Sequence, residues 1–373
     1  MEIHPKITPI YQSSVFKFED LNELEQYFGE PGSRYMYSRN GNPNSDELAA
    51  AVNRLEGGAG AVATGSGMAA IFAAFMAFCQ AGDHVLCAAD IYGGSSSLLN
   101  AELSRLGISV TYVPFEQLND LTSFVQPTTR LLLVETLSNP LLRVVDLRQV
   151  AAECHRHELK LVVDNTFATP VLTRPLELGA DISLHSVTKY IAGHSDVTAG
   201  VVVAADADIA ARLKQIGAFY GLTLSPMESW LAVRGLKTLR LRVREHSHNA
   251  LAVATFLAQH AAVRAVYYPG LTTHSQHELA EAQGAGLFGG MLSILLADDA
   301  EVVNGFMRRS QRFPFAPSLA GVDSSMSYPL GTSHRYLTPE QQADLGISTG
   351  LVRLSVGIEP AEELLADLAQ ALA

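Results

Sequence analysis

Cysteine, tryptophan and long apolar stretches are scarce in this chain of 373 residues. Its three cysteines are an odd number and none belongs to a Cys-x-x-Cys pair, so the sequence predicts neither a disulfide framework nor a thiolate zinc site. The longest apolar run, Met68 to Cys79, is too short to cross a bilayer as a helix. The first residues also lack the basic and then apolar segments of a secretory signal. We therefore expect a protein of the reducing cytoplasm that has no membrane partner.

Excess positive charge is also missing, because the formal net charge is -12 at pH 7. Such a balance works against nonspecific binding to nucleic acid or to an anionic membrane. The densest basic cluster is formed by Arg240, Arg242 and Arg244, and no nucleic-acid-binding motif accompanies it. We interpret this cluster as a solvated or interface patch and expect no nucleic-acid partner.

The sequence does contain enough apolar material for a large core. Hydrophobic residues make up 48% of the chain and charged residues 17%, and the length allows two domains. Short continuous apolar runs, separated by helical segments, cover residues 84–87, 110–113, 131–134, 161–163 and 200–203. Runs of this kind are typical of a mostly parallel sheet with helices on both faces. The sequence therefore predicts an α/β fold.

Three segments are expected along the chain. Residues 1–45 contain repeated prolines and glycines with little periodicity, which predicts an extended N-terminal arm that reaches the neighbouring subunit. Residues 46–247 contain the apolar runs and would form the main, cofactor-binding domain. Residues 248–373 would form a smaller C-terminal domain with strands near 265–267 and 291–295.

Lys189 is the most informative residue for chemistry, because it follows Asp164, the last residue of an apolar run, by 25 positions. A lysine amine can form a Schiff base with the aldehyde of pyridoxal phosphate. A carboxylate opposite the pyridine nitrogen keeps that nitrogen protonated, so that the ring accepts electrons from a substrate carbanion. Ligands of open α/β sheets bind outside the carboxyl ends of the strands, where Asp164 and also Glu135 would lie. The pairing predicts a pyridoxal phosphate enzyme.

A phosphate cradle is predicted at the start of the apolar helix, in Thr64-Gly65-Ser66-Gly67-Met68-Ala69-Ala70. Its glycines leave backbone amides free to approach an anion at the positive end of the helix dipole. The hydroxyl groups of Ser186 and Thr188, beside Lys189, could supply further hydrogen bonds. We expect these two segments to bind the phosphate of the cofactor together.

Other interpretations use the same residues. Residues 65–70 fit the loose dinucleotide pattern Gly-x-Gly-x-x-Ala of a dehydrogenase, which needs an acid at a strand end about 20 residues further on. Asp83 instead precedes a predicted strand, and Asp90 lies in a loop beyond one. Residues 186–189 fit the Ser-x-x-Lys of penicillin-interacting acyl enzymes, but the later Lys-Thr-Gly is missing and Asp164 would have no role. Both remain minor alternatives, as does a noncatalytic cofactor-binding protein.

Two pairs of histidines suggest a metal site. His155 and His157 are two positions apart, and so are His246 and His248. On a helix such positions do not share a face. We interpret both pairs as surface features and expect no metal.

Six ordered motifs resemble the Cys/Met-metabolism enzymes of transsulfuration, which include cystathionine γ-synthase, cystathionine γ- and β-lyases, methionine γ-lyase and acylhomoserine sulfhydrylases. The resemblance covers nearly the whole chain. Its motifs are Tyr37-Ser38-Arg39-Asn40-Gly41-Asn42-Pro43, Ser66-Gly67-Met68-Ala69-Ala70, Tyr92-Gly93-Gly94, Asp164-Asn165-Thr166-Phe167, Ser186-Val187-Thr188-Lys189-Tyr190 and Leu351-Val352-Arg353-Leu354-Ser355-Val356-Gly357. The resemblance implies an aminotransferase-like fold of type I with a smaller α/β C-terminal domain.

The resemblance also implies roles for the candidate site residues. Lys189 would be the Schiff-base lysine, Asp164 would pair with the pyridinium, and Tyr92 would stack on the cofactor and assist proton transfer. Arg353 would bind the substrate α-carboxylate with help from Asn139 and Ser318. The residues that would hold the phosphate are Ser66, Gly67, Met68, Ser186 and Thr188, joined by Tyr37 and Arg39, which would come from the neighbouring subunit. The implied assembly is a homotetramer, a dimer of dimers with active sites shared across the dimer.

Departures from the family pattern bear on the substrate. Met36 and Pro317 stand where cystathionine-specific members commonly carry acids that can meet the distal amino group, and Gly94 replaces the cysteine of methionine γ-lyases. Asn44 and Ala320 are further departures. We expect a γ-elimination lyase that acts on a Cγ-substituted amino acid, such as cystathionine or a homoserine derivative, and releases a 2-oxo acid and ammonia. The alternatives are γ-replacement, as in cystathionine γ-synthase or an O-acylhomoserine sulfhydrylase, and β-elimination from cystathionine.

Overall fold

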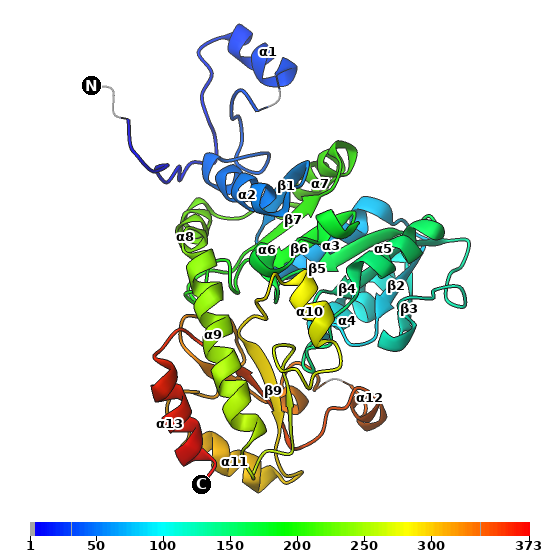
Figure 1. The fold of residues 1–373 in the computed structure, drawn as a ribbon. Coiled ribbons are helices and arrows are strands. Elements are labelled where there is room, and N and C mark those ends of the chain that lie inside the picture. Colours follow the sequence, from blue (N-terminus) through cyan, green and yellow to red (C-terminus); the bar gives the residue numbers. More distant parts are fainter. Residues whose placement is uncertain (1–3, 31, 336) are drawn as a thin grey trace.

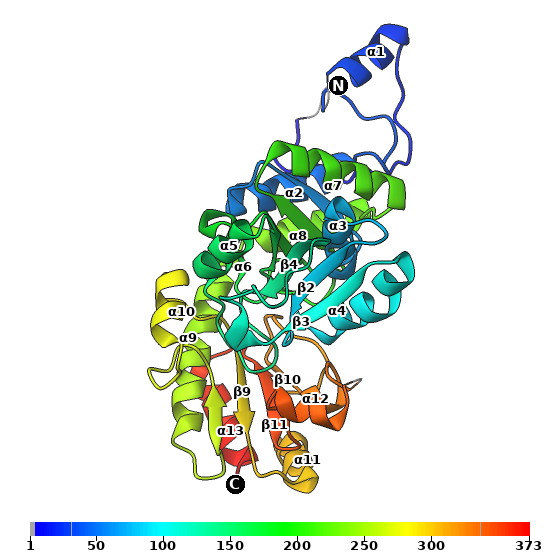
Figure 2. The same ribbon diagram turned by 90° about the vertical axis from the view of Figure 1, so that its right-hand side faces the viewer.

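The computed structural model describes residues 4–30, 32–335 and 337–373. Part of the predicted arm, residues 1–3 and Pro31, lies outside the described residues, as does Tyr336. The strands of the described ranges form a seven-stranded sheet and a four-stranded sheet, which occupy different parts of the molecule (Figures 1 and 2). No helix within these ranges is both long and apolar enough to span a membrane.

The larger sheet has the mostly parallel topology that the apolar runs predict. Its strand order is β1-β7-β6-β5-β4-β2-β3, and β7 pairs antiparallel with both of its neighbours while the pairs from β6 to β3 are parallel. Its strands are β1 (Gly60–Thr64), β2 (His84–Ala88), β3 (Ser109–Val113), β4 (Thr129–Glu135), β5 (Lys160–Asp164), β6 (Ile182–Ser186) and β7 (Gly200–Ala204). Since both faces are buried, β4, β5 and β7 carry continuous apolar runs, whereas β6 alternates and its polar Ser183 and His185 are buried against Glu56 of the helix on one face.

Helices pack on both faces of this sheet. Leu48 and Val52 of α2 share a core cluster with Val201 and Val203, whereas α3 and α7 share another with Val202 and its strand neighbour Ala204. Because successive strand residues point to opposite faces, α2 covers one face and α3 and α7 the other. The helices from the N-terminus to β7 are α1 (Leu21–Gly29), α2 (Pro43–Glu56), α3 (Gly67–Phe78), α4 (Gly93–Ser97), α5 (Leu147–Arg156) and α6 (Thr169–Leu172). The later helices are α7 (Ala207–Tyr220), α8 (Pro226–Leu236), α9 (Leu239–Ala258), α10 (His277–Gln283), α11 (Ala300–Arg309), α12 (Pro339–Asp344) and α13 (Ala361–Ala371).

The smaller sheet is antiparallel, with the order β10-β11-β9-β8. Its strands are β8 (Ala265–Tyr267), β9 (Met291–Leu295), β10 (Ser325–Ser327) and β11 (Leu351–Ser355). Apolar side chains of α9, α11 and α13 form the core against it, for example Val253, Phe306 and Leu368. The predicted domain boundary after residue 247 falls inside α9, and the division into domains remains a prediction.

The N-terminal arm is less extended than predicted, because it contains α1. The side chain of Asp20 caps this helix by accepting a hydrogen bond from the backbone N–H of Glu23 at 3.0 Å. None of the residues of α1 is buried, and the helix projects from the body of the molecule in both views (Figures 1 and 2). The arm also presents apolar side chains to solvent, including Leu21 and Phe28.

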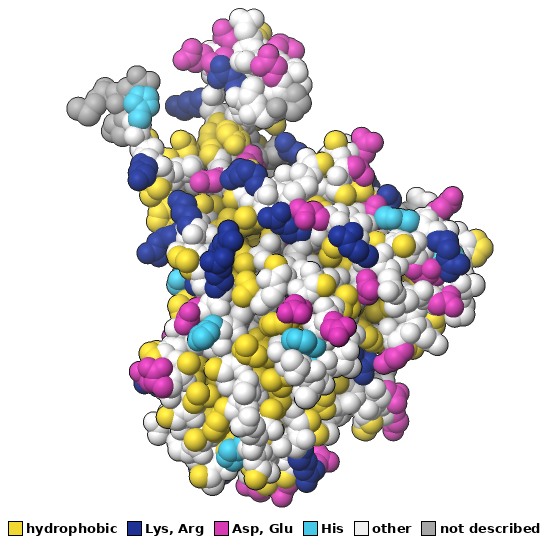
Figure 3. Space-filling model, viewed as in Figure 1, with side chains coloured by type: hydrophobic (Ala, Val, Ile, Leu, Met, Phe, Trp, Pro, Cys, Tyr) yellow, Lys and Arg dark blue, Asp and Glu magenta, His cyan; other side chains and the backbone are white. Residues whose placement is uncertain are grey.

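The interpretation of the basic cluster and of His246 as surface features is wrong in part. Arg240 and Arg244 are exposed, but Arg242 is only 4% exposed and His246 is fully buried. Both lie on the face of α9 that packs on the segment after β6, a neighbour that helical spacing alone does not reveal. In Figure 3, Lys and Arg side chains gather on the surface around α2 and α8.

Candidate active site

Three strand ends meet at the carboxyl edge of the larger sheet. Glu135 ends β4 and pairs in register with Asp164, which ends β5, and Ser186 ends the next strand, β6. Lys189 lies in the turn that follows β6. Since parallel strands end at the same edge, residues far apart in sequence surround one cavity of about 490 Å³.

Most of the predicted site residues line this cavity. They are Ser66, Gly67, Met68, Tyr92, Asn139, Asp164, Ser186, Thr188, Lys189 and Arg353. Glu135 and Pro317, which the sequence predicts at the sheet edge and at the distal end of the substrate, also line it. Further lining residues were not predicted: Ile71, Leu137, Thr166, Phe167, Thr198, Leu319, Thr332 and Ser333. Ser318 is not among the lining residues, although both of its chain neighbours are. The signal for Glu135 was present, because it ends an apolar run as Asp164 does.

The Asp164 carboxylate is fixed by Thr166. Its Oδ1 accepts hydrogen bonds from the Thr166 backbone N–H at 3.0 Å and from the Thr166 hydroxyl at 2.5 Å. Burial raises the pKa of Asp164, and the two bonds from Thr166 oppose that rise. Burial and the Asp164 charge raise the pKa of Glu135 well above its usual value. The pair therefore favours an ionised Asp164 beside a protonated Glu135.

A buried hydrogen-bond network holds these strand ends from the opposite side of the sheet. Glu56 of α2 accepts hydrogen bonds at Oε1 from Asn165 Nδ2 at 3.0 Å and from the Ser183 hydroxyl at 2.9 Å, and His185 Nε2 lies 2.6 Å away. Asn165 Oδ1 accepts a hydrogen bond from Thr136 at 2.8 Å. The network thus joins the ends of β4, β5 and β6, each of which carries a cavity residue.

The surroundings of Lys189 favour reaction of its amine with an aldehyde. Burial and the charge of Arg353 lower its pKa, which increases the fraction of the neutral, nucleophilic amine. The backbone of Lys189 is fixed at both ends of its turn: its N–H donates to Ser186 O at 3.1 Å, and its C=O accepts from Gly193 N at 2.8 Å. The amine therefore projects from a closed turn.

The N-terminus of α3 lies against Ser186. Ser66 caps the helix, with its hydroxyl accepting from Ala69 N at 3.1 Å, so the N–H groups of the first turn face the cavity end. A Cβ atom on Gly67 would lie 2.7 Å from the Cβ of Ser186, so only glycine allows this approach. Backbone N–H groups beside the hydroxyls of Ser186 and Thr188 form a suitable cradle for a phosphate.

Arg353 enters the cavity from β11 of the smaller sheet. Its Nη1 donates to Asn139 Oδ1 at 2.8 Å, and the side chain is 5% exposed. Burial lowers the pKa of Arg353 to about 10, so it is still cationic at neutral pH. A planar cation held by an amide is a suitable site for a carboxylate.

Tyr92 stands at the rim of the cavity. Its backbone N–H donates to Glu135 Oε1 at 2.7 Å, and the residue is 44% exposed. A side chain at Gly93 would overlap the carbonyl oxygen of Ser333, and a side chain at Gly94 would overlap the Tyr92 ring. Gly93 therefore allows this turn to pack against the loop that contains Ser333, and Gly94 leaves room for the Tyr92 ring.

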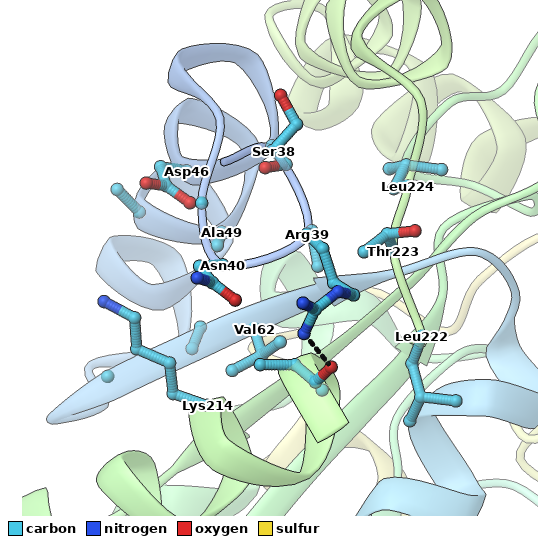
Figure 4. A pocket seen from close by; sticks show the side chains of 18 of the residues that line it. Ser38, Arg39, Asn40, Asp46, Ala49, Val62, Lys214, Leu222, Thr223 and Leu224 are labelled. Carbon is cyan, nitrogen blue, oxygen red and sulfur yellow. Dashed lines mark hydrogen bonds between the residues drawn. The ribbon is translucent and has the colours of Figure 1, made fainter. Parts of the chain in front are cut away.

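Tyr37 and Arg39 do not line this cavity within the chain. Arg39 lines a separate cavity of about 280 Å³ between the arm, α2 and α7, together with Asp46 and Lys214 (Figure 4). Its Nη1 donates to Ala218 O at 3.1 Å, and its guanidinium lies 5.5 Å from the centre of the Tyr37 ring. The structure thus brings together the sheet-borne site residues but not the arm-borne ones.

The described residues contain no group of three or more histidine, cysteine or acidic side chains arranged to hold a metal ion. His155 is half exposed, and His157 Nε2 instead lies 3.2 Å from Glu153 Oε1. The lysine, the carboxylate and the helix N-terminus around the cavity match the aldehyde, pyridine nitrogen and phosphate of pyridoxal phosphate, so the residues present fit this cofactor.

Comparison with known proteins agrees with this chemistry. The model of the family described as "Cys/Met metabolism PLP-dependent enzyme" matches residues 2–373. The cystathionine gamma-lyase of Bacillus subtilis (strain 168) is 43% identical over 364 residues, which cover 98% of this chain and 93% of the relative. The cystathionine beta-lyase of Lactococcus lactis subsp. cremoris (strain MG1363) has the same identity and the same coverage.

Solved structures show the same similarity in three dimensions. The cystathionine gamma synthase from Xanthomonas oryzae pv. oryzae, in complex with cystathionine, is 43% identical and has a TM-score of 0.91, with 98% of this chain and 92% of that chain covered. The family resemblance and the predicted fold class are therefore confirmed. Proteins named as a gamma-lyase, a beta-lyase and a gamma-synthase share one level of identity, so overall similarity does not distinguish their reactions.

Proposed function

Because the chain belongs to the Cys/Met metabolism family of pyridoxal phosphate-dependent enzymes, we propose that it is a γ-elimination lyase. Its substrate would be an amino acid with a sulfur or oxygen substituent at Cγ, such as cystathionine or a homoserine derivative, and its products a 2-oxo acid and ammonia. One observation carries the proposal: Lys189, Asp164 and Arg353 line a single cavity.

Lys189 and Asp164 would act on opposite sides of the cofactor. Bound pyridoxal phosphate supplies an electron sink for a carbanion. Asp164, kept ionised by Thr166, would hold the proton on the pyridine nitrogen. Lys189 would bind the cofactor covalently and, when the substrate amine takes its place, would move a proton between Cα and Cβ. Such a proton shift is required before a γ-substituent can leave.

The remaining cavity residues would position the cofactor and the substrate. Ser66, Gly67 and Met68 would bind the phosphate at the helix N-terminus, and Ser186 and Thr188 would donate hydroxyl hydrogen bonds. Arg353, held by Asn139, would bind the α-carboxylate, and Ser318 would support it. Tyr92 would stack on the cofactor and assist proton transfer from the cavity rim.

Tyr37 and Arg39 would complete the active site of a neighbouring subunit. This proposal is supported by the exposure of both side chains and by their absence from the residues that line the chain's own cavity. We propose a homotetramer built from two such dimers. The buried, unpaired state of all three cysteines supports a place in the reducing cytoplasm.

The lining of the cavity does not favour strict recognition of cystathionine. Pro317 lines the cavity where an acid would meet a distal ammonium group, and among the described lining residues the carboxylates are Glu135 and Asp164. Both lie at the sheet edge, at the ends of β4 and β5. The similarity to a gamma-synthase with bound cystathionine favours γ-replacement by a thiol as the second candidate, and cystathionine β-elimination is the third.

Mass-spectrometric product analysis with L-cystathionine tests these candidates. The cofactor-loaded enzyme should produce cysteine, 2-oxobutyrate and ammonia, since γ-cleavage adds one water across the substrate. Homocysteine with pyruvate would move the assignment to β-elimination. If cystathionine is not turned over, O-acylhomoserines with and without a thiol acceptor distinguish elimination from replacement, and failure of all these substrates would contradict the proposal.

A further inference from the structure

Arg242 is the buried member of a basic cluster, and it contacts the turn that carries Lys189. We propose that Arg242 is a positioning residue for the reaction: its guanidinium fixes the backbone of residues 190–193 and thereby the direction of the Lys189 side chain. The inference rests on the proposed role of Lys189 as the residue that binds the cofactor. It assigns to α9, which contributes no lining residue of the cavity, a part in the chemistry.

The hydrogen bonds of Arg242 point to this role. Its Nη1 donates to the carbonyl oxygen of Tyr190 at 2.7 Å, and its Nη2 donates to that of Ile191 at 3.2 Å. The same Nη2 donates to Gly235 O at 2.9 Å, and Nε donates to the Thr238 hydroxyl at 3.1 Å. One side chain therefore ties the two residues directly after Lys189 to the end of α8 and the start of α9.

The backbone packs closely around this guanidinium. A Cβ atom on Gly193, whose φ is +74°, would overlap Arg242, and a Cβ atom on Gly235 would overlap the carbonyl oxygen of Ala192. Gly193 N also donates to Lys189 O at 2.8 Å, which closes the turn. The turn and α8 are thus in direct contact around the arginine, so a change in the arginine must be transmitted to the turn.

Tyr190 is held at its ring as well as at its carbonyl oxygen. Its hydroxyl accepts from Gly290 N at 3.1 Å, and its ring meets the buried His246 edge-on, with 5.2 Å between the ring centres. His246 Nδ1 lies 2.7 Å from Val356 O, a residue just after β11. The residue next to Lys189 is therefore fixed from α9 and from the strand that carries Arg353.

The charge of Arg242 argues against a role in packing alone. Within the part of the chain that the structure describes, no carboxylate pairs with this buried cation. Burial lowers the pKa of Arg242 to about 10, a sign of the desolvation that the fold tolerates. Uncharged side chains could fill the space with a smaller desolvation free energy, but only a planar guanidinium can donate to three carbonyl groups in this arrangement.

Arg242→Lys is the main test, because it keeps the positive charge but removes the planar set of guanidinium donors. We expect the bound cofactor to dissociate about tenfold faster, followed by visible absorbance, and kcat to fall about tenfold with little change in KM, because a small displacement of a reacting group is costly. Val253→Ala, a core change elsewhere on α9, controls for loss of stability, and Arg240→Lys and Arg244→Lys control for the helix surface. These three variants should keep the cofactor and kcat.

The proposal is overturned if Arg242→Lys lowers only the unfolding temperature, as Val253→Ala does, while cofactor retention and kcat stay at the parent values. If Arg242→Lys does not fold, Thr238→Val removes one hydrogen bond of the arginine and should give a smaller effect in the same direction; an unchanged cofactor release rate would then contradict the proposal. Borohydride reduction followed by peptide mass analysis distinguishes a failure of the Arg242 proposal from a failure of the Lys189 proposal. If the Lys189 peptide of the reduced parent enzyme does not carry the mass of the cofactor, the proposed role of Lys189 itself is refuted.

Discussion

The cavity lined by Lys189 and the smaller cavity lined by Arg39 differ in how their residues are held. The larger cavity takes its groups from the ends of β4, β5 and β6, and these ends are joined by a buried network around Glu56. The smaller cavity takes Arg39 from the arm, beside α2 and α7, and the guanidinium of Arg39 donates a hydrogen bond to the carbonyl oxygen of Ala218. The larger cavity can therefore be assembled within one chain, whereas Arg39 is placed as expected of a residue that contributes to the active site of another chain.

This difference bears on preorganisation. Arg353 is buried and Asp164 and Lys189 are partly buried, so most of the free-energy cost of removing these groups from water is incurred during folding. Tyr37 is 41% exposed and the described residues of α1 are all unburied, so a large part of the arm would lose contact with water only on assembly. Substitutions in the larger cavity should therefore affect each subunit separately, and substitutions in the arm should depend on the partner.

Lys189→Ala is the strongest test of the larger cavity. Turnover should fall at least about a thousandfold, because the covalent attachment of the cofactor and the proton shift are both lost. Visible absorbance of the bound cofactor and product mass spectrometry measure the two losses. Lys214→Ala, a matched change in the smaller cavity, should keep the absorbance that depends on Lys189. Retained turnover in Lys189→Ala would contradict the assignment of the amine.

Arg353→Lys should lower kcat/KM about a hundredfold, mainly through KM. The lysine keeps the positive charge but cannot bind the carboxylate with two parallel hydrogen bonds or keep the contact with Asn139 unchanged. Steady-state kinetics with the best substrate measure the effect, and cofactor absorbance should stay at the parent level. A loss of cofactor with unchanged KM would instead place Arg353 on the cofactor side of the cavity.

Mixing two inactive variants tests the role of the arm. Subunits with Lys189→Ala and subunits with Arg39→Ala should recover at most about a quarter of the parent activity, because half of randomly formed dimers are mixed and each has one intact site. Activity after joint refolding or subunit exchange, compared with each variant alone, measures the recovery. Mixed dimers that are demonstrated by mass and remain inactive would show that Arg39 does not act across the interface.

The same contrast explains what the sequence could predict. Lys189, Asp164 and the helix start at Ser66 follow from strand ends and local motifs, because parallel strands must deliver their last residues to one edge. The burial of Arg242 and His246 could not be predicted, because it depends on the turn after β6, about 50 positions earlier in the chain. The helix α1 was missed although Asp20 caps it and Leu21, Leu24 and Phe28 follow at helical spacing. Its nine residues are too short a run to stand out in a segment rich in proline and glycine.

Glu135 lies in the larger cavity and Asp46 in the smaller one, and burial raises the pKa of both carboxyl groups. A carboxyl group whose pKa is higher in the folded than in the unfolded chain stabilises the fold most at low pH. That contribution is lost as the pH rises from the unfolded value, about 4.3 for glutamate, through the folded value. The Asp46 charge is offset by Tyr35 and Lys214, whereas Glu135 faces the like charge of Asp164.

Glu135→Gln should therefore stabilise the cofactor-free protein at neutral pH, because glutamine cannot ionise and its oxygen can still accept the hydrogen bond from Tyr92. Its advantage over the parent should grow with pH by up to about 1.4 kcal/mol per pH unit in the window between the two pKa values, while Asp46→Asn should show a smaller change. Urea unfolding between pH 5 and pH 8 measures both. An advantage that shrinks as the pH rises would mean that Glu135 is ionised in the folded chain, and the larger cavity would then carry two negative charges at its sheet edge.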